Sequence, residues 1–271
     1  MALKKMKVTS RQDVFKSKPE TKIWYEHPRK DNPYLAETSS CHGYDLRELI
    51  KSQSFVDVFF LLFKGELPEK HESALLEKLM IAHINPGPRH PATRASMSAA
   101  ISKTNIAHLL PIALSVNGGE HMGATEVFNS MWFLKKHIDS EPAKLVENLI
   151  KKTNTTSDND WKIAPGFGTR FGGIDKQQSE IATFLIDGQS HFKSLLWAEK
   201  FSKQLLQHGA GWLAPGLAAA VFNDLGMHPR AGIGLYQIMN APGLFAHGIE
   251  QANKPLTNMP FLAKEHYVIL D

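Results

Sequence analysis

The chain has 271 residues, 42% of them hydrophobic, which suits one large or two modest globular domains. Lys and Arg outnumber Asp and Glu by only 31 to 27, and this dispersed excess argues against a nucleic-acid-binding protein. The N-terminal segment lacks an apolar signal-peptide core, and no stretch reaches the roughly 18 apolar residues of a membrane span, so we expect no membrane partner and no secretion. A single cysteine, Cys41, excludes an intramolecular disulfide and favours a soluble, cytoplasmic protein in which Cys41 is a packed residue rather than a nucleophile.

The first 40 residues are polar and are interrupted by Pro19, Pro28 and Pro33. Proline in these positions prevents long helices. We therefore expect an arm that lies across the body of the protein.

Residues 41–68 predict two short, consecutive helices. Asp45 is placed to accept backbone N–H bonds in the first turn of one helix, and Gly65 with Pro68 ends the other. The apolar run 55–63 is too continuous for a solvated helix, which predicts burial on most sides, although a buried strand fits the periodicity equally well. Taken singly, these residues indicate core packing and no chemistry.

Helical periodicity recurs through the rest of the chain, so the predicted fold class is mostly α. The predicted helical segments are Lys70–His83, Arg94–Ser102, Ala107–Val116, Thr125–His137, Glu141–Lys152, Ser179–Asp187, Phe192–His208, Leu213–Leu225 and Ile233–Gln251. Alternation typical of a strand is confined to Tyr267–Leu270. The polar stretch 153–160 and the Gly-rich stretch 164–173 are typical of loop backbone. We expect these two stretches to flank a hinge or a ligand-binding loop.

Polar groups concentrate in the loop HINPGPRHPATR, namely His83, Arg89, His90, Thr93 and Arg94. Guanidinium groups match carboxylates and phosphates bidentately, so the loop is a candidate anion site. The alternative is a surface loop that caps the helix beginning near Arg94. No ligand spacing of the HExxH type and no GxSxG sequence are present, which argues against a metal site and a serine nucleophile.

Four segments, in this order and spacing, resemble the citrate synthase family over roughly residues 42–251. They are GYDLRELI with FLLFKGELP, NGGEHMGATE at 117–126, APGFGTRF at 164–171 and LYQIMNAPGLFAHGIEQ at 235–251. The resemblance implies a mostly helical homodimer with a large domain, residues 1–126 and 227–271, and a small domain, residues 127–226. It also implies carbon–carbon chemistry beside a CoA thioester, with CoA thioester and a small carboxylate as ligands and no permanently bound cofactor.

Carried over residue by residue, the resemblance places His121 at the enol-stabilising position and keeps Arg170 after the PGFG loop. The dicarboxylate-binding His of the family becomes Thr169, the catalytic Asp becomes Pro215, and the tail-helix Arg becomes Asn240. For His121 alone, a core or helix-capping role is the other interpretation.

The leading hypothesis is an enzyme of citryl-CoA lyase or atypical citrate synthase type. His121 would stabilise the enolate, and His83 or His90 would serve as the base for a substrate hydroxyl. The acidic partner would be bound by Arg89, His90, Arg94, Thr169 and Arg170. Cleavage is slightly favoured over synthesis, because a retro-aldol step does not need the methyl-deprotonating Asp. The alternative hypothesis is a catalytically silent homologue that serves as a binding or scaffold protein.

Overall fold

The computed structural model describes residues 17–153, 162–188, 191–260 and 262–268. The chain divides into two compact units, Met1–Leu67 and Pro68–Asp271. The boundary between these units does not coincide with that between the predicted large domain and the predicted small domain. The division into a large and a small domain therefore stays a prediction.

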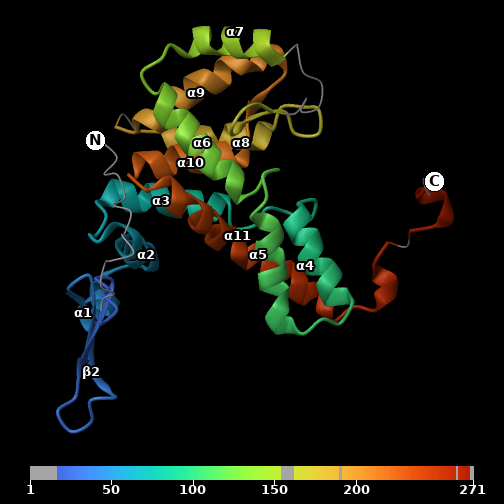
Figure 1. The fold of residues 1–271 in the computed structure, drawn as a ribbon. Coiled ribbons are helices and arrows are strands. Elements are labelled where there is room, and N and C mark those ends of the chain that lie inside the picture. Colours follow the sequence, from blue (N-terminus) through green and yellow to red (C-terminus); the bar gives the residue numbers. More distant parts are fainter. Residues whose placement is uncertain (1–16, 154–161, 189–190, 261, 269–271) are drawn as a thin grey trace. The chain divides into compact units, whose positions relative to one another are not determined.

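The described residues contain eleven α-helices, so the prediction of a mostly α fold is confirmed (Figure 1). The helices are α1 (Leu46–Ser52), α2 (Phe55–Lys64), α3 (Lys70–Ala82), α4 (Pro91–Ile101), α5 (Leu109–Asn117), α6 (Ala124–His137), α7 (Pro142–Thr153), α8 (Lys176–Ile186), α9 (Lys193–Leu205), α10 (Ala214–Asp224) and α11 (Pro229–Ala252). Every segment predicted to be helical carries a helix, and short 3-10 turns precede α5 and follow α9.

Two small antiparallel sheets contradict the prediction that strands are nearly absent. One has the order β1 (Trp24–Pro28), β2 (Ala36–Cys41) and β3 (Tyr44–Asp45), and the other has the order β4 (Lys162–Ala164), β5 (Phe167–Gly168) and β6 (Gly211–Trp212). The predicted arm thus holds a hairpin, and the predicted Gly-rich loop is partly a strand pair. Tyr267 and Val268 are not in a strand, while Ile269 and Leu270 lie outside the described residues.

The start of α1 and the end of α2 in the N-terminal unit agree with the prediction from residues 41–68. Asp45 accepts the backbone N–H groups of Arg47 and Glu48, and Gly65 ends α2 in a left-handed conformation. Cys41, Leu49 and Leu61 form its core, so Cys41 is a packed residue as predicted. The prediction that the run 55–63 is buried on most sides is wrong, because Phe55 is 76% exposed and Phe63 is 44% exposed.

The long helix α11 organises the second unit, in which it packs against α4, α5, α6 and α10 (Figure 1). Pro242 interrupts its hydrogen-bond ladder, since a proline in a helix removes a donor and crowds the preceding turn. The amide of Gly243 instead donates to the carbonyl of Ile84, 2.9 Å away, outside the helix. This bond ties the loop that follows α3 to the middle of α11.

Helix α10 is the most deeply buried element, because Ala214 to Phe222 are all buried. It packs against α6, α9 and α11. At its start, the backbone of Gly216 meets the turn between β4 and β5: a Cβ at Gly216 would lie 2.1 Å from the carbonyl oxygen of Gly166. Only glycine at both positions permits this contact.

An aromatic cluster fills the interior beside that turn. The ring of Phe167 lies 4.9 Å from the rings of Phe201 and Trp212, and Phe201 stacks on Trp197 at 5.2 Å. The two tryptophan N–H groups donate to the Ser140 carbonyl and the Glu199 carboxylate. Because Phe167 follows the turn directly, its burial anchors the Gly-rich segment.

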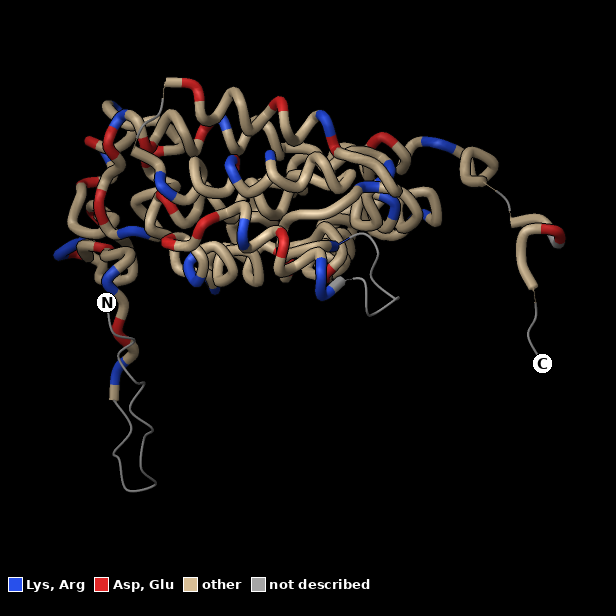
Figure 2. The backbone as a smooth tube through the Cα atoms, turned by 90° about the horizontal axis from the view of Figure 1, so that it is seen from above, with Lys and Arg blue, Asp and Glu red and all other residues tan. Residues whose placement is uncertain are grey.

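Figure 2 shows Lys and Arg interspersed with Asp and Glu along the described backbone. Within that part of the chain, no helix has the length and apolar composition to cross a bilayer. The polar stretch predicted as a hinge or ligand loop lies outside the described residues, apart from Thr153 at the end of α7.

The close approach at Gly216 makes a direct stability prediction. Gly216→Ala should lower the free energy of unfolding by about 2–3 kcal/mol, because the new methyl group overlaps the backbone of Gly166. Gly234→Ala is the matched control: nothing lies within 4 Å of its added Cβ, and alanine should stabilise α11 by about 0.5–1 kcal/mol. Urea denaturation of both variants measures the difference. Equal stability of the two would contradict this packing.

Asp224 makes a pH-dependent prediction. Its carboxylate accepts the N–H groups of Ser194 and Leu195 at 2.7 and 2.8 Å, yet burial outweighs these bonds and raises its pKa to about 6. The folded state then binds the Asp224 proton more tightly than the unfolded state. The resulting contribution to the free energy of unfolding is complete below about pH 4 and is lost as the pH rises to about 6. Across this window the term amounts to about 3 kcal/mol.

Asp224→Asn should remove this pH-dependent term, as urea denaturation between pH 4 and 7 would measure. Ser194→Ala is the control, because it keeps the backbone N–H that faces Asp224 and should keep the wild-type profile. An Asp224→Asn profile parallel to that of the wild type would contradict the assignment.

Candidate functional site

Polar side chains from distant segments surround a small cavity of about 60 Å³ in the second unit, called here the inner cavity. The end of α3, the loop before α4, the start of α8 and the middle of α11 supply its walls. Its polar lining side chains include His83, His90, Arg170, Gln178, Tyr236 and Asn240. Two of the predicted bases and one predicted arginine therefore meet at one place.

His83 ends α3 and is buried. Its Nδ1 lies 3.2 Å from the Leu79 carbonyl oxygen, to which it donates in the tautomer that leaves Nε2 with a lone pair. That Nε2 is buried and has no well-aligned hydrogen-bond partner, although the Gln178 side chain lies close to the ring. Burial lowers the pKa of His83, and the Leu79 carbonyl and Gln178 oppose this shift only in part. The imidazole is thus a neutral acceptor in the cavity wall.

Asn240 and Gln178 add further polar atoms to the same wall. The Asn240 amide donates to the His83 carbonyl at 2.9 Å, which leaves its buried Oδ1 without a partner. Gln178 Oε1 is also buried and unpartnered. Burial raises the pKa of the Tyr236 phenol, which therefore stays protonated. Unpaired buried polar groups are costly, so their concentration around one cavity points to a ligand that pairs with them.

His90 has a different local role. Its Nδ1 accepts the Ala92 N–H at 3.2 Å as the N-cap of α4, and its Nε2 lies 3.3 Å from the Met122 carbonyl oxygen. Burial lowers its pKa, which favours the neutral ring that both contacts require. The capping alternative raised from the sequence therefore describes His90. With both ring nitrogens engaged, His90 positions the 122 loop, and His83 is the better placed base.

A second hollow, also of about 60 Å³, adjoins the inner cavity and is called here the outer hollow. His90, Met122 and Arg170 line both spaces, and His121 and Thr169 face only the outer hollow, together with Arg89. His121 is exposed and is neither a core residue nor a helix cap, since Gly123 caps α6. The structure thus brings the predicted enol-stabilising His to the predicted carboxylate-binding loop.

Arg170 is the cation shared by the two spaces. Its guanidinium forms an ion pair with Asp175 at 2.9 Å, and Asp175 also caps α8 by accepting the Gln178 N–H. The pairing orients the guanidinium and neutralises part of its charge. Arg89, by contrast, is exposed on the loop before α4.

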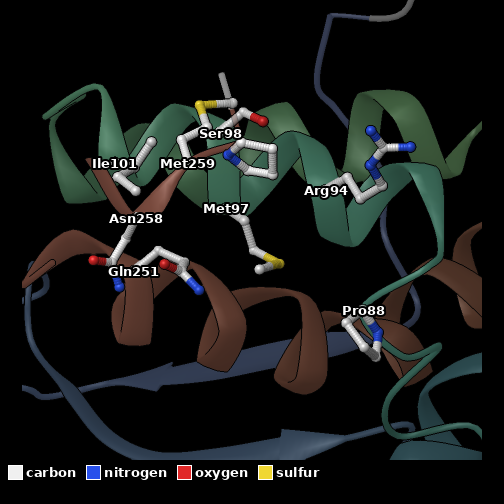
Figure 3. A pocket seen from close by; sticks show the side chains of 9 residues that line it. Pro88, Arg94, Met97, Ser98, Ile101, Gln251, Asn258 and Met259 are labelled. Atoms are coloured by element: carbon white, nitrogen blue, oxygen red, sulfur yellow. The ribbon is translucent and has the colours of Figure 1, made fainter. Parts of the chain in front are cut away.

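Arg94 is the predicted site residue that the fold does not bring to this place. It lies one turn into α4, beside a different groove of about 210 Å³ between α4 and the end of α11. Figure 3 shows Met97 pointing from α4 toward α11, with the Arg94 guanidinium directed away from it. Arg94 therefore does not line the inner cavity or the outer hollow.

Glu126 is a positioning residue that sequence reasoning missed. It is fully buried on α6, where its Oε1 accepts the Gly166 N–H at 2.8 Å and pairs with the Lys162 ammonium at 3.1 Å. Its place in the NGGEHMGATE segment, at the start of an otherwise apolar helix face, was the available signal. Through this contact the loop bearing His121 and the loop bearing Arg170 are held together.

The site contains acceptors, donors and cations but no carboxylate facing its interior. Among the described residues, no Asp or Glu lines the inner cavity or the outer hollow, and Pro215, at the position of the family's catalytic Asp, is buried in the first turn of α10. Among the described residues, no cluster of His, Cys, Asp and Glu is arranged to hold a metal ion. The arrangement suits binding of an anion and stabilisation of an oxyanion.

No protein-family model matches the sequence, and no curated protein matches it at a significant level. Solved structures do match the fold. Citryl-CoA lyase from Hydrogenobacter thermophilus superposes with a TM-score of 0.72 at 22% identity, over 93% of this chain and 94% of that one. ATP citrate lyase from Methanothrix soehngenii, solved with citrate and coenzyme A, has a TM-score of 0.70 at 14% identity.

Citrate synthase from Thermoplasma acidophilum, solved with carboxymethyl coenzyme A and oxaloacetate, superposes with a TM-score of 0.59 at 19% identity, over 81% of this chain. The chain spans 44% of the ATP citrate lyase and 58% of that citrate synthase, but nearly the whole citryl-CoA lyase. The motifs and the three superpositions agree, and the chain has the fold of the citrate synthase superfamily.

Proposed function

We propose that the protein is an enzyme that acts on a carbon–carbon bond of an acyl-CoA thioester, of citryl-CoA lyase or atypical citrate synthase type. The observation that carries this proposal is the meeting of His83, His121 and Arg170 around two adjoining spaces. These residues come from separate segments of the chain. The likeness in fold to citryl-CoA lyase and citrate synthase supports the same reaction class.

In this proposal His121 donates a hydrogen bond to the thioester oxygen as the enolate develops. A donor placed at a developing oxyanion in a partly water-excluded site lowers the barrier more than it strengthens substrate binding. Arg170 binds the carboxylate of the acidic partner, and Arg89 and the neutral hydroxyl of Thr169 lie beside it on the outer hollow. Arg94, which faces another groove, is left out of this set.

Cleavage is the proposed direction. Synthesis requires a base that removes a proton from the acyl methyl group, and Pro215 provides none. Cleavage requires a base for the substrate hydroxyl, and the neutral Nε2 of His83 in the wall of the inner cavity meets this need. We further propose a cytoplasmic homodimer in which the small domain, residues 127–226, closes over the thioester, with CoA as substrate and no permanently bound cofactor.

The role of His121 is tested by substitution. His121→Ala should lower kcat/KM for release of acetyl-CoA from 3-hydroxyacyl-CoA thioesters at least about 100-fold, because the oxyanion donor is lost. His108→Ala is the matched control, since His108 is exposed on the 3-10 turn before α5 and lines neither the inner cavity nor the outer hollow. Unchanged turnover of His121→Ala would contradict the assignment.

The role of His83 has a signature in the pH profile. Because burial lowers its pKa below the usual value near 6.5, the basic form persists into mildly acidic solution, and the acid limb of kcat/KM should fall below pH 6.5. His83→Gln should abolish this limb and lower kcat about 100-fold or more. A rate profile that keeps the same limb in the variant would assign the base elsewhere.

One observation favours a second candidate, a catalytically silent homologue with a binding or scaffold role: no carboxylate faces the inner cavity or the outer hollow. Under this alternative the purified protein binds CoA or a small carboxylate in titration calorimetry but releases no acetyl-CoA from any thioester. Turnover that depends on His121 would exclude the alternative.

A further inference from the structure

We infer that the partner released at this site is a small 2-oxo acid with one carboxylate, so that the thioester cleaved is a monocarboxylic 3-hydroxyacyl-CoA and not a dicarboxylic one. The inference rests on the proposed function and narrows its substrate class. It comes from the charge, the hydrogen-bond polarity and the size of the inner cavity.

The charge of the inner cavity suits one carboxylate. Of the described residues that line it, Arg170 is the only Lys or Arg, and Asp175 already neutralises part of that charge from 2.9 Å. Arg89 lines the outer hollow and is exposed, so it does not add a cation to the inner cavity. A second carboxylate inside would lose its hydration without gaining a counterion, which disfavours its binding.

The hydrogen-bond polarity of the wall points the same way. The tautomer of His83 and the orientation of Asn240 are each fixed by a bond to a backbone carbonyl, which leaves Nε2 and Oδ1 as acceptors. Both residues are more than nine-tenths buried. Acceptors repel a carboxylate, whereas the hydroxyl of the 3-hydroxyacyl group can donate its one proton to His83 Nε2. The acidic group of the ligand therefore lies toward Arg170 and its hydroxyl toward His83.

The volume of the inner cavity limits the partner further. At about 60 Å³ the inner cavity is small, which favours a three-carbon 2-oxo acid over a bulkier four-carbon oxo-dicarboxylate. The thioester portion then lies in the outer hollow beside His121.

The reaction balances without a further reactant. His83 Nε2 takes the proton of the 3-hydroxyl group, C3 becomes the carbonyl of the oxo acid, and the bond between C2 and C3 breaks. Its electron pair moves to C2 and forms the acetyl-CoA enolate, whose oxygen is held by His121. The enolate takes one proton at C2 to give acetyl-CoA, and the proton on His83 balances that uptake.

Three thioesters test the inference on the full-length wild-type protein, with acetyl-CoA release measured by chromatography. They are 3-carboxy-3-hydroxybutanoyl-CoA, with one carboxylate, citryl-CoA, with two, and 3-hydroxy-3-methylbutanoyl-CoA, with none. We expect kcat/KM for the first to exceed that for each of the others at least tenfold. Citryl-CoA cleaved as well or better would overturn the inference and leave the proposed function intact. Absence of acetyl-CoA from all three would contradict the proposed function, and the inference with it.

Added positive charge should shift this preference. Asn240→Arg places a second cation in the wall of the inner cavity and should raise the ratio of citryl-CoA to monocarboxylate turnover at least tenfold. An unchanged ratio in folded Asn240→Arg would overturn the inference. Because Asn240 is buried, the comparison of the three thioesters on the wild-type protein decides the outcome where Asn240→Arg fails to fold.

Discussion

The buried carboxylate of Glu126 is the constraint on which the geometry of the site depends. A charged group without solvent costs several kcal/mol unless it is paired and hydrogen-bonded. Glu126 meets this condition only if the Gly166 amide and the Lys162 ammonium reach it, that is, only if the turn between β4 and β5 rests on α6. His121 lies just before α6 and Arg170 just after β5, so this one contact sets the two sides of the outer hollow at a fixed separation.

Strained backbone conformations occur beside the outer hollow. Among the described residues, the non-glycine positions with positive φ are His42, Lys103, Met122 and Phe171. Met122 and Phe171, at φ 58° and 52°, both line the outer hollow, directly after His121 and Arg170. Such conformations cost of order 1–3 kcal/mol each and persist only when the surrounding packing over-determines them. Here Glu126, the Gly166 and Gly216 contact and the buried Phe167 ring supply that packing.

The helices could be predicted from the sequence because apolar residues repeat at helical spacing over nine or more positions. The strands could not, since β3, β5 and β6 have two residues each, too few to show an alternation. Burial of the run 55–63 was predicted wrongly because composition does not reveal which faces a neighbouring element covers. Exposed Phe55 sits in α2 despite its apolar neighbours.

Residues of the candidate site could be predicted from the sequence only where a reactive or charged side chain lies within a recognisable motif. His121, Thr169 and Arg170 were found because the order of segments resembles a family. Arg94 was grouped with His90 by closeness in sequence, but His90 caps α4 and Arg94 lies a full turn later, on another groove. Gln178 and Asn240 were missed as cavity acceptors because a polar residue in a helix usually faces solvent. Only the packing of α8 and α11 reveals that both are buried.

The start of α10 explains why the proposed chemistry runs toward cleavage. Its first turn is buried, and Ala214 lines the inner cavity while Pro215 fills the second helical position. A proline in the first turn fixes the backbone at no cost in helical hydrogen bonds, since the first four amides of a helix have no partner within it. The site thus lacks a fixed anion and keeps a neutral imidazole, which can take a proton from an alcohol far more readily than from a thioester methyl group. The same absence of negative charge leaves Arg170 with Asp175 as its one ion-pair partner in the described structure, so the ligand's carboxylate completes the charge balance of the cavity.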